Sequence, residues 1–317
     1  MPDSDTNDAP TLDTTIMVAG AAGDLGARIT RALVARGADV RALVRPEASQ
    51  ADRDRLTTIG ATLAPADPTD VDSMASVLEG ADGVVSALNG LRDVILDRQS
   101  ALLDAAVLAG VPRFISSDYS ADFTKTPPGR NRNFDLRREF MGRADRASIQ
   151  MTSVLNGAFM DMLSGVMPVI QPRIKRVLYW GDADQPLDFT TKDDTAVFTA
   201  AAALDPAAPR ILRIAGGTAT ARDLAEMMSE VAGERYRPLR VGGIGSLGAL
   251  IRATQIIAPE RDSVFPAWQG MQYMRDMFSG QAKLAPLDND RYPDVSWTRL
   301  PDLLNDTFSP DRVLQSA

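Results

Sequence analysis

Apolar and polar residues follow two different periods in turn along the first half of the chain. Short continuous apolar runs occupy residues 15–19 and 40–44, which is typical of strands buried on both faces of a parallel sheet. Between these runs the apolar residues recur at helical spacing, at Leu25, Ile29 and Leu33. The order strand, helix, strand therefore predicts an α/β fold built on a doubly wound parallel sheet.

The same alternation continues to about residue 155. Further apolar runs lie at residues 61–64, 83–88, 113–115 and 152–155, and a helical pattern covers residues 93–109. Ligands of open α/β sheets bind beyond the carboxyl ends of the strands. The segments that should therefore gather at one edge of the sheet are residues 20–26, 45, 67, 86–90 and 116–119.

A glycine-rich turn, Gly20-Ala-Ala-Gly23-Asp-Leu-Gly26, follows the first apolar run directly. Glycines let the backbone approach a pyrophosphate, and the phosphate charge then faces unpaired N–H groups at the start of the next helix. An ordinary tight turn is the alternative, but the strand before the turn and the helix after it supply the context that a dinucleotide site requires. The cofactor contacts expected here are Gly20, Ala22, Gly23, Asp24, Leu25 and Gly26.

The second strand of the pattern ends at Arg45. A cofactor with a free ribose 2′-hydroxyl usually meets Asp or Glu at this place, whereas arginine meets a 2′-phosphate. Arg45 therefore favours NADP(H) over NAD(H), the alternative being a solvated surface arginine. The contacts expected from the other strand ends are Asp67, Ala87, Leu88, Asn89, Ser116 and Ser117.

Composition narrows the class of protein. The 317 residues carry a net charge of −8, which argues against a broad surface for nucleic acid or for an anionic membrane. No apolar run approaches the length of a membrane span, and the polar, acidic residues 1–13 indicate a disordered tail and not a signal peptide. We therefore expect a cytoplasmic protein.

Two residue types, cysteine and histidine, are absent from the sequence. Their absence excludes a thiol nucleophile, an imidazole base, a Ser-His-Asp triad and zinc sites built on thiolate or imidazole, and we expect no metal. The chemistry must then come from carboxylates, Lys, Arg, Tyr, Ser, backbone groups or a bound cofactor.

Residues 134–141, FDLRREFM, predict a helix with one arginine on its inward side. Phe134, Leu136 and Phe140 form an apolar arc, and Arg137 falls near the middle of it. Arginine is almost never buried without a partner, so Arg137 is a candidate functional residue.

Together these segments resemble the NmrA-like, isoflavone reductase-like group of atypical short-chain dehydrogenase/reductases. The markers are GAAGDLG, VRALVRPE, the helix with Gln99, VPRFISSDYS, FDLRREF, SVLNGAFMDML and YWGDADQPLDFTTKDD. The resemblance implies a Rossmann core that binds NADP(H) and a smaller, mostly helical substrate-binding part. We place the core at residues 14–155, rejoined by about 175–204, and the smaller part at 156–174 and 205–317. Some members of the group reduce aromatic compounds, and others bind NADP(H) as redox-sensing regulators without known turnover.

The sequence departs from this group at the catalytic position. The reductases carry a lysine where this chain has Arg137, and the Tyr-x-x-x-Lys pair of the wider superfamily is missing at Tyr119. A guanidinium stays protonated, so it cannot act as a base, although it can hold a phosphate or steady a developing oxyanion. A structural ion pair with Asp118 is the alternative role for Arg137.

Proton delivery then falls to Tyr119, Lys125 or water. Tyr119 has a phenol that can donate a proton, or it is a core aromatic. Lys125 lies in the loop TKTPPGRNRN, which is more typical of a solvated lid. The resemblance also implies that Asn156 and Phe159 line the nicotinamide end of the cofactor, although Asn-Gly is first of all a turn signal.

One apolar stripe in the second half remains open to two interpretations. Its members recur at helical spacing and are Phe265, Trp268, Met271, Met274, Met277 and Phe278. Such a stripe usually packs in the core, but it could also form an adaptable apolar surface that contacts a bulky aromatic substrate.

The function that these features favour is an NADPH-dependent reductase transferring hydride to a small or aromatic electrophile, such as an enone, a ketone or a quinone-methide-like compound. One alternative is an NADP(H)-binding redox-sensing regulator without turnover, and another is an isomerase or dehydratase that keeps its cofactor. Besides the small-molecule substrate, the partners considered are a second copy of the chain or a regulatory protein, with no nucleic acid or membrane.

Overall fold

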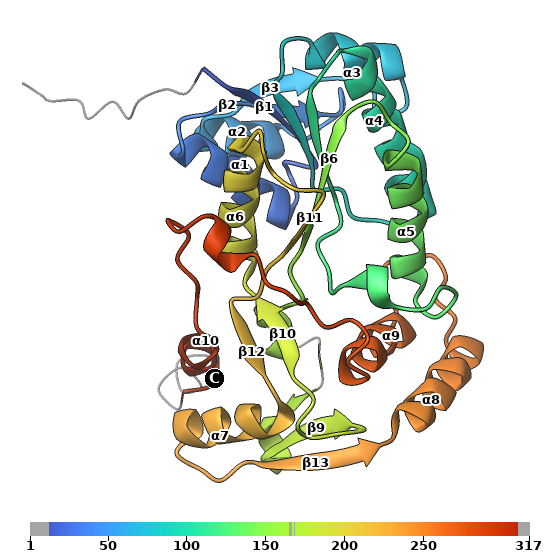
Figure 1. Ribbon diagram of the computed structural model, residues 1–317, viewed down its shortest axis with the longest axis vertical. Helices are drawn as coiled ribbons and strands as arrows, with labels where there is room; N and C mark the ends of the chain where they lie inside the picture. Colours follow the sequence, from blue (N-terminus) through green and yellow to red (C-terminus); the bar gives the residue numbers. More distant parts are fainter. Residues whose placement is uncertain (1–12, 165–166, 168, 310–317) are drawn as a thin grey trace, which may run out of the picture.

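A central sheet of seven parallel strands organises the protein, in the order β11-β6-β5-β4-β1-β2-β3 (Figure 1). The computed structural model describes residues 13–164, 167 and 169–309, so the tail expected at 1–13 lies, apart from Asp13, outside the described residues. The strands are β1 (Thr15–Ala19), β2 (Asp39–Val44), β3 (Thr62–Pro65), β4 (Gly83–Ser86), β5 (Arg113–Ser116), β6 (Gln150–Leu155) and β11 (Ile211–Arg213). This is the doubly wound Rossmann arrangement that the sequence predicts.

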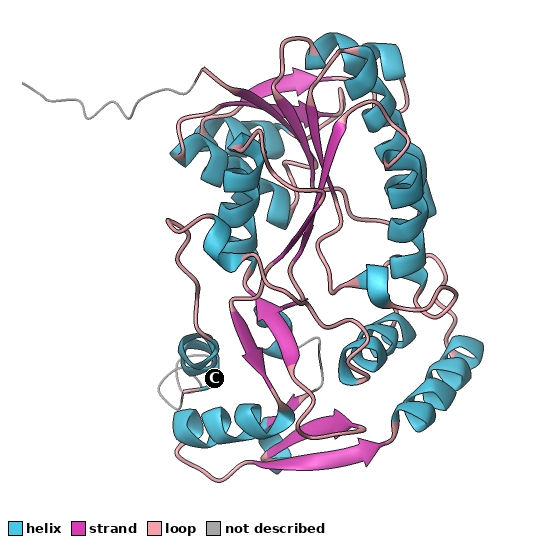
Figure 2. Ribbon diagram, viewed as in Figure 1, coloured by secondary structure: helices cyan, strands magenta, loops and turns pink. Residues whose placement is uncertain are grey.

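Helices cover both faces of this sheet (Figure 2). One face carries α1 (Asp24–Ala35), α2 (Gln50–Ile59) and α6 (Lys192–Leu204), and the other carries α3 (Val71–Leu78), α4 (Gln99–Leu108) and α5 (Arg132–Ala144). Strand β1 shows how one apolar run serves both cores. Ile16 and Val18 pack with the first set of helices, whereas Met17 and Ala19 pack with the second.

Local signals set the ends of the helices next to the site. The Ser49 side chain accepts a hydrogen bond from the Asp52 N–H and so caps α2, which ends at Gly60 with a φ of 101°. Asn131 caps α5 by accepting from the Phe134 N–H. A π-helical turn, η1 (Asp93–Arg98), runs directly into α4, and such turns often occur at functional sites.

The smaller part contains two three-stranded sheets, ordered β12-β10-β7 and β13-β9-β8. Its strands are β7 (Ala158–Phe159), β8 (Ile170–Gln171), β9 (Arg176–Trp180), β10 (Leu187–Thr190), β12 (Gly217–Ala219) and β13 (Arg237–Gly242). Its helices are α7 (Ala221–Ala232), α8 (Ile244–Ile257), α9 (Ala267–Phe278) and α10 (Leu300–Phe308). Short turns of 3-10 helix are η2 (Phe123–Lys125), η3 (Met160–Ser164), η4 (Pro172–Ile174) and η5 (Asn289–Arg291).

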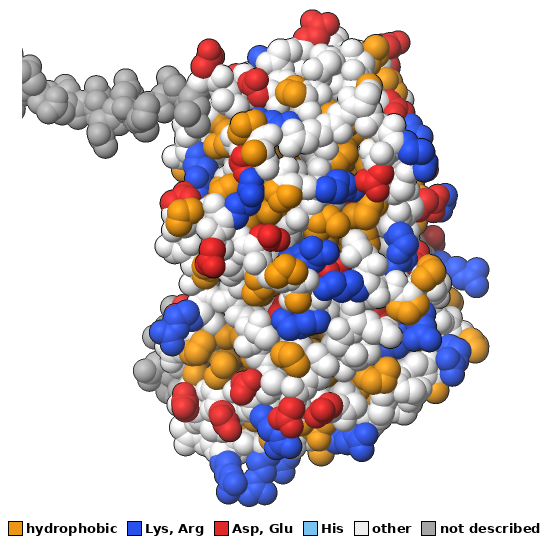
Figure 3. All heavy atoms as spheres, in the orientation of Figure 1, with side chains coloured by type: hydrophobic (Ala, Val, Ile, Leu, Met, Phe, Trp, Pro, Cys, Tyr) orange, Lys and Arg blue, Asp and Glu red, His pale blue; other side chains and the backbone are white. Residues whose placement is uncertain are grey.

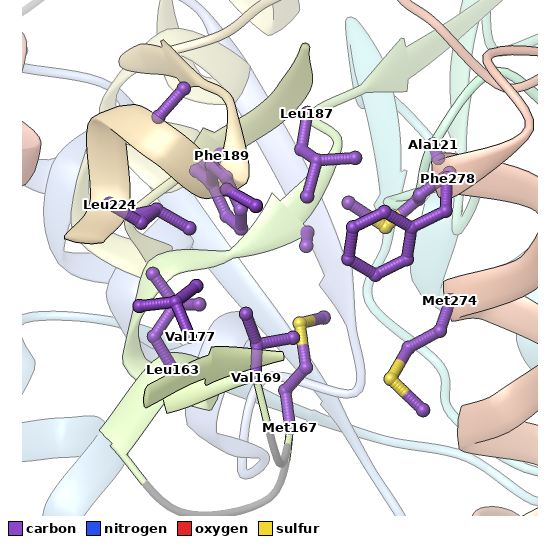
Figure 4. Close-up of a cluster of buried hydrophobic side chains, with 14 of the residues drawn as sticks. Ala121, Leu163, Met167, Val169, Val177, Leu187, Phe189, Leu224, Met274 and Phe278 are labelled. Atoms are coloured by element: carbon purple, nitrogen blue, oxygen red, sulfur yellow. The ribbon is translucent and has the colours of Figure 1, made fainter. Parts of the chain in front are cut away.

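The smaller part has its own apolar core, in which Val177, Phe189 and Leu224 face Met274 and Phe278 of α9 (Figure 4). Most of the aromatic and methionine stripe of α9 is therefore core, as the commoner interpretation predicts. Its first member, Phe265, lies before the helix and is exposed.

Some segments lie in a different part from the one expected. Strands β9 and β10, expected to rejoin the Rossmann core, pair within the two small sheets. Strand β11, expected in the smaller part, instead pairs with β6 at the edge of the central sheet, because Leu212 packs beside Val154 in that core. Residues 292–297 also return to it, where the rings of Tyr292 and Trp297 meet Phe198. Helix α6 joins the core as expected.

The surface mixes acidic and basic side chains on the face shown in Figure 3, and basic side chains gather at the end that carries β13. Arg235, Arg237 and Arg240 are exposed at that end. Among the residues that the structure describes, no helix is long and apolar enough to cross a bilayer, and no group of three acidic side chains is arranged to hold a metal ion.

Candidate cofactor site and active site

The glycine turn is shaped by contacts that exclude any side chain. Gly20 adopts a φ of +78°, and a Cβ atom there would lie 2.7 Å from the Ala87 carbonyl oxygen at the end of β4. A Cβ on Gly26 would lie 2.0 Å from the Gly20 oxygen, so α1 packs directly on the turn. The Gly23 N–H donates to the Gly20 oxygen at 2.9 Å, and Gly23 caps α1 without a side-chain bond. The start of α1 is therefore a bare helix N-terminus, which suits a phosphate.

A charged cluster lies beside this turn and includes a lysine that the sequence analysis missed. The Asp24 carboxylate pairs with Lys192 of α6 at 2.8 Å and with Arg28 at 2.9 Å, and these bonds lower the pKa of Asp24. Lys192 also pairs with Asp161 at 2.6 Å and lies 5.9 Å from the centre of the Phe159 ring. Burial disfavours the Lys192 charge, but the two carboxylates outweigh it and raise the pKa of Lys192.

Arg45 is placed at the end of β2 with its side chain 61% exposed, 3.6 Å from Glu47. Its guanidinium is open to solvent beside that carboxylate, and its contact with a 2′-phosphate stays a prediction. The following loop is held by Arg53, which donates to the Pro46 carbonyl at 2.7 Å. Arg55, a cation that the sequence analysis did not single out, donates to the Ala22 carbonyl and so ties α2 to the glycine turn.

The ends of β4 and β5 are held together by one buried amide. The Gln99 Oε1 atom accepts from the Ser86 hydroxyl at 2.7 Å and from the Ser117 N–H at 3.0 Å. The Ser117 hydroxyl in turn donates to the Leu88 carbonyl at 2.6 Å. Several expected cofactor contacts are thus brought together, and Ala87 joins them by donating its N–H to the Ala19 carbonyl.

Two further expected contacts, Asp67 and Asn89, are exposed at the same edge. The Asp67 carboxylate accepts hydrogen bonds from both the hydroxyl and the N–H of Thr69, which lower its pKa. Asp67 therefore shapes its own turn, and Asn89 lies just beyond the end of β4.

Arg137 is buried, with 8% of its surface exposed, as its place in the apolar arc predicts. Its Nη1 atom donates to the Asn133 carbonyl at 3.2 Å, and its buried Nε atom has no partner among the described residues. The alternative ion pair with Asp118 does not form. The Asp118 carboxylate instead accepts from the hydroxyls of Ser116 and Ser153.

Tyr119 and Lys125 have surroundings that the sequence did not reveal. The Tyr119 ring packs with Phe198 and Val154 in the core of the Rossmann sheet, and burial raises the pKa of its phenol. The phenol oxygen has no hydrogen-bond partner among the described residues, and the nearby Thr199 hydroxyl donates to the Thr195 carbonyl at 2.7 Å.

The Lys125 ammonium donates to the carbonyls of Lys283 and Ala285, each at 3.0 Å, and lies 3.3 Å from the buried Asp122. These contacts join the loop after β5 to the segment after α9. They give Lys125 a structural role, and its catalytic role stays a prediction.

Asn156 is fully buried, and both polar atoms of its amide lack a partner among the described residues. Its backbone is fixed, because its N–H donates to the Ser120 carbonyl at 2.9 Å and its carbonyl accepts from the Thr190 hydroxyl at 2.7 Å. A native buried amide is rarely left unsatisfied, so this side chain requires a partner that the described residues do not supply, and its contact with the cofactor stays a prediction. Phe159 follows it and is half-buried.

The profile of the NmrA-like family matches residues 12–256, which is most of the sequence. The chain belongs to the NmrA-like family. Isoflavone reductase homolog IRL of Zea mays is 30% identical over 241 residues, covering 70% of this chain and 75% of the relative. Pinoresinol reductase 1 of Arabidopsis thaliana is 31% identical over 208 residues, covering 61% of this chain and 65% of the relative, slightly under two thirds of its length.

The fold is shared with solved structures at lower identity. The binary complex of leucoanthocyanidin reductase with NADPH from Vitis vinifera superposes with a TM-score of 0.76 at 17% identity, covering 93% of this chain and 99% of that chain. This likeness confirms the Rossmann core with its smaller second part.

The site of this NmrA-like chain fits a dinucleotide. The turn at Gly20 leaves a cradle that a Cβ would fill, the N-terminus of α1 is bare, and Asn156 offers an unsatisfied amide. Lys192 lies within a quoted family marker but was not expected at the site, and Gln99 was named only as a family marker. Neither has a local pattern that reveals its contacts.

Proposed function

We propose that this chain is an NADPH-dependent reductase that transfers hydride to an aromatic electrophile, such as an enone, a ketone or a quinone-methide-like compound. Curated relatives named as pinoresinol reductases and an isoflavone reductase homolog support the class of reaction. The glycine cradle and the exposed Arg45 support NADP(H) as cofactor.

The observation that carries the proposal is Arg137, a buried cation without a carboxylate partner among the described residues. Bound NADPH supplies the hydride, and the electron pair of the reduced double bond then moves onto the substrate oxygen. A fixed guanidinium stabilises that developing oxyanion without giving up a proton. Because Lys125 is tied to carbonyls and Tyr119 lies inside the core, we assign the final proton to water.

The same arginine also supports a second candidate function, an NADP(H)-binding redox sensor, because a guanidinium cannot take the role of a basic lysine. The two functions differ in consumption of the cofactor. A sensor binds NADPH tightly, consumes none and changes its association with a partner protein.

The experiment is to follow loss of NADPH absorbance against aromatic enones, ketones, quinones and benzylic ethers, with Arg137→Ala alongside. Consumption by the native protein that falls at least about 100-fold in a variant that still binds NADPH supports the reductase. Tight NADPH binding without consumption across the panel counts for the sensor. Product formation at constant NADPH identifies an isomerase or a dehydratase.

A further inference from the structure

The guanidinium of Arg137 has no counter-charge within the described part of the chain. The acids of its own helix are taken, because Asp135 pairs with Arg138 and Glu139 pairs with Arg92. Asp118 forms no ion pair with Arg137 either. Its Oδ2 atom accepts from two serine hydroxyls, and its buried Oδ1 atom has no partner among the described residues. A buried charge without a partner is costly, so the protein keeps this cation for a group that arrives from outside.

The arriving group is better assigned to the substrate than to the cofactor phosphates. The glycine turn leads into α1 on one face of the sheet, and Arg45 ends β2, whereas α5 covers the opposite face (Figure 1). The first turn of α5 instead meets the smaller part. Arg132 donates to the carbonyls of Ser263 at 3.0 Å and Val264 at 2.8 Å, and Arg137 lies little more than one helical turn further on.

We infer that Arg137 binds a carboxylate on the substrate, so that the protein acts on aromatic electrophiles that are already anionic. This inference rests on the proposed function and narrows its substrate class. A lysine can lose its proton and then accept one from a neutral phenol, but a guanidinium cannot, so the charge must be present when the substrate binds. The planar donor fork of arginine matches the two oxygens of a carboxylate.

The test compares two acceptors with the same carbon skeleton, the anion 4-oxo-4-phenylbut-2-enoate and its neutral methyl ester, which is larger by one methyl group. The native protein should prefer the acid in kcat/KM by at least about tenfold, as expected for charge-assisted hydrogen bonds. In Arg137→Met the kcat should fall for both acceptors, because the developing oxyanion loses its guanidinium, whereas the KM should rise by a similar factor for the acid alone. The KM for the ester and the affinity for NADPH should stay within about twofold.

Two further variants control this experiment. Arg137→Lys keeps the positive charge but lacks the planar pair of donors, so it should prefer the acid to a smaller degree than the native protein does. A retained preference shows that the variants still fold and that their losses come from weaker recognition of the carboxylate. Arg143→Met removes an exposed arginine of the same helix that pairs with Asp104 at 2.6 Å, and it should leave the ratio of acid to ester unchanged.

A binding measurement separates this inference from the proposed reaction. Cinnamate and cinnamamide are titrated by calorimetry into the protein loaded with NADP+. If cinnamate binding depends on Arg137 but no acceptor is turned over, the result supports the carboxylate site and contradicts the proposed reductase activity. Equal affinity for cinnamate and cinnamamide, or equal kcat/KM for acid and ester, overturns the inference even if NADPH is consumed. A large loss of NADPH affinity in Arg137→Met also overturns it, because the arginine then serves the cofactor.

Discussion

The glycine turn and the contact between α5 and α9 differ in how their geometry is fixed: the first depends on neighbouring backbone atoms, the second on side chains from distant parts of the sequence. Gly20 to Gly26 are consecutive, and their geometry depends on backbone atoms that approach too closely for a side chain. The contact between α5 and α9 joins residues far apart in the sequence through side chains. Asn131 donates to Asp276 and accepts from Gln269, and Arg132 stacks on Trp268 at 4.7 Å. The cofactor side of the site is thus local, and the Arg137 side is long-range.

The largest effect is expected from Gly26→Ala, which tests the glycine turn. A Cβ at 2.0 Å from the Gly20 oxygen forces the turn and α1 apart, so we expect a loss of at least about 3 kcal/mol of stability and of NADPH binding. The control is Gly142→Ala in α5, where a Cβ meets nothing within 4 Å, and which should gain up to about 1 kcal/mol. Thermal unfolding and NADPH titration check both. Normal NADPH affinity in Gly26→Ala would show that the turn does not carry the cofactor.

The long-range side is tested by Asn131→Ala. This change removes the cap of α5 and leaves Asp276 and Gln269 without their amide partner, so we expect a loss of about 2–3 kcal/mol by denaturant unfolding. Substrate KM should rise while NADPH affinity holds. The matched control, Thr220→Ala, removes the cap of α7 and should cost only about 1 kcal/mol. An unchanged KM in Asn131→Ala would separate the α9 contact from the active site.

The variant Lys192→Met tests whether a residue from the second half of the chain contributes to NADPH binding at the glycine turn. Loss of the ammonium removes one of the two cations that pair with Asp24 and a cation that pairs with Asp161, so the negative charge beside the glycine turn increases. NADPH affinity should therefore fall about tenfold at low salt and less at high salt. Lys175→Met removes an exposed lysine paired with Glu234 and serves as control. Equal NADPH affinity at low salt in native protein and Lys192→Met would exclude Lys192 from the site.

The smallest effect expected is a change in pH dependence from Asp276. Burial raises the pKa of this carboxyl above its usual value, although Asn131 and Arg275 oppose the rise. The folded state therefore holds this proton more tightly than the unfolded state. Its contribution to stability is fully present below the unfolded pKa and is lost as the pH rises through the folded pKa. Asp276→Asn should flatten this part of the stability profile. An unaltered profile from pH 3 to pH 7, a range set around carboxyl titration, would contradict the assignment.

The same contrast explains what could be predicted from the sequence. The family, the Rossmann sheet and the buried position of Arg137 are confirmed, because each depends on a short motif or on helical periodicity. The placement of β9 and β11 was wrong, because an apolar strand of a few residues carries no mark of the strand it pairs with. Likewise, nothing near Lys125 in the sequence indicates its bonds to the Lys283 and Ala285 carbonyls.

The chain passes between the two parts of the molecule repeatedly. It leaves the central sheet after β6, returns at α6, leaves again after β11, and comes back to Phe198 with residues 292–297 before it forms α10. Because several connections join the two parts, rotation about a single hinge is resisted. We therefore expect small shear movements between the parts and not a hinge opening. A protease cut in one connection should leave the halves associated. New substrate specificity would accordingly be engineered by exchanging loops, because neither half forms a unit that can be transplanted whole.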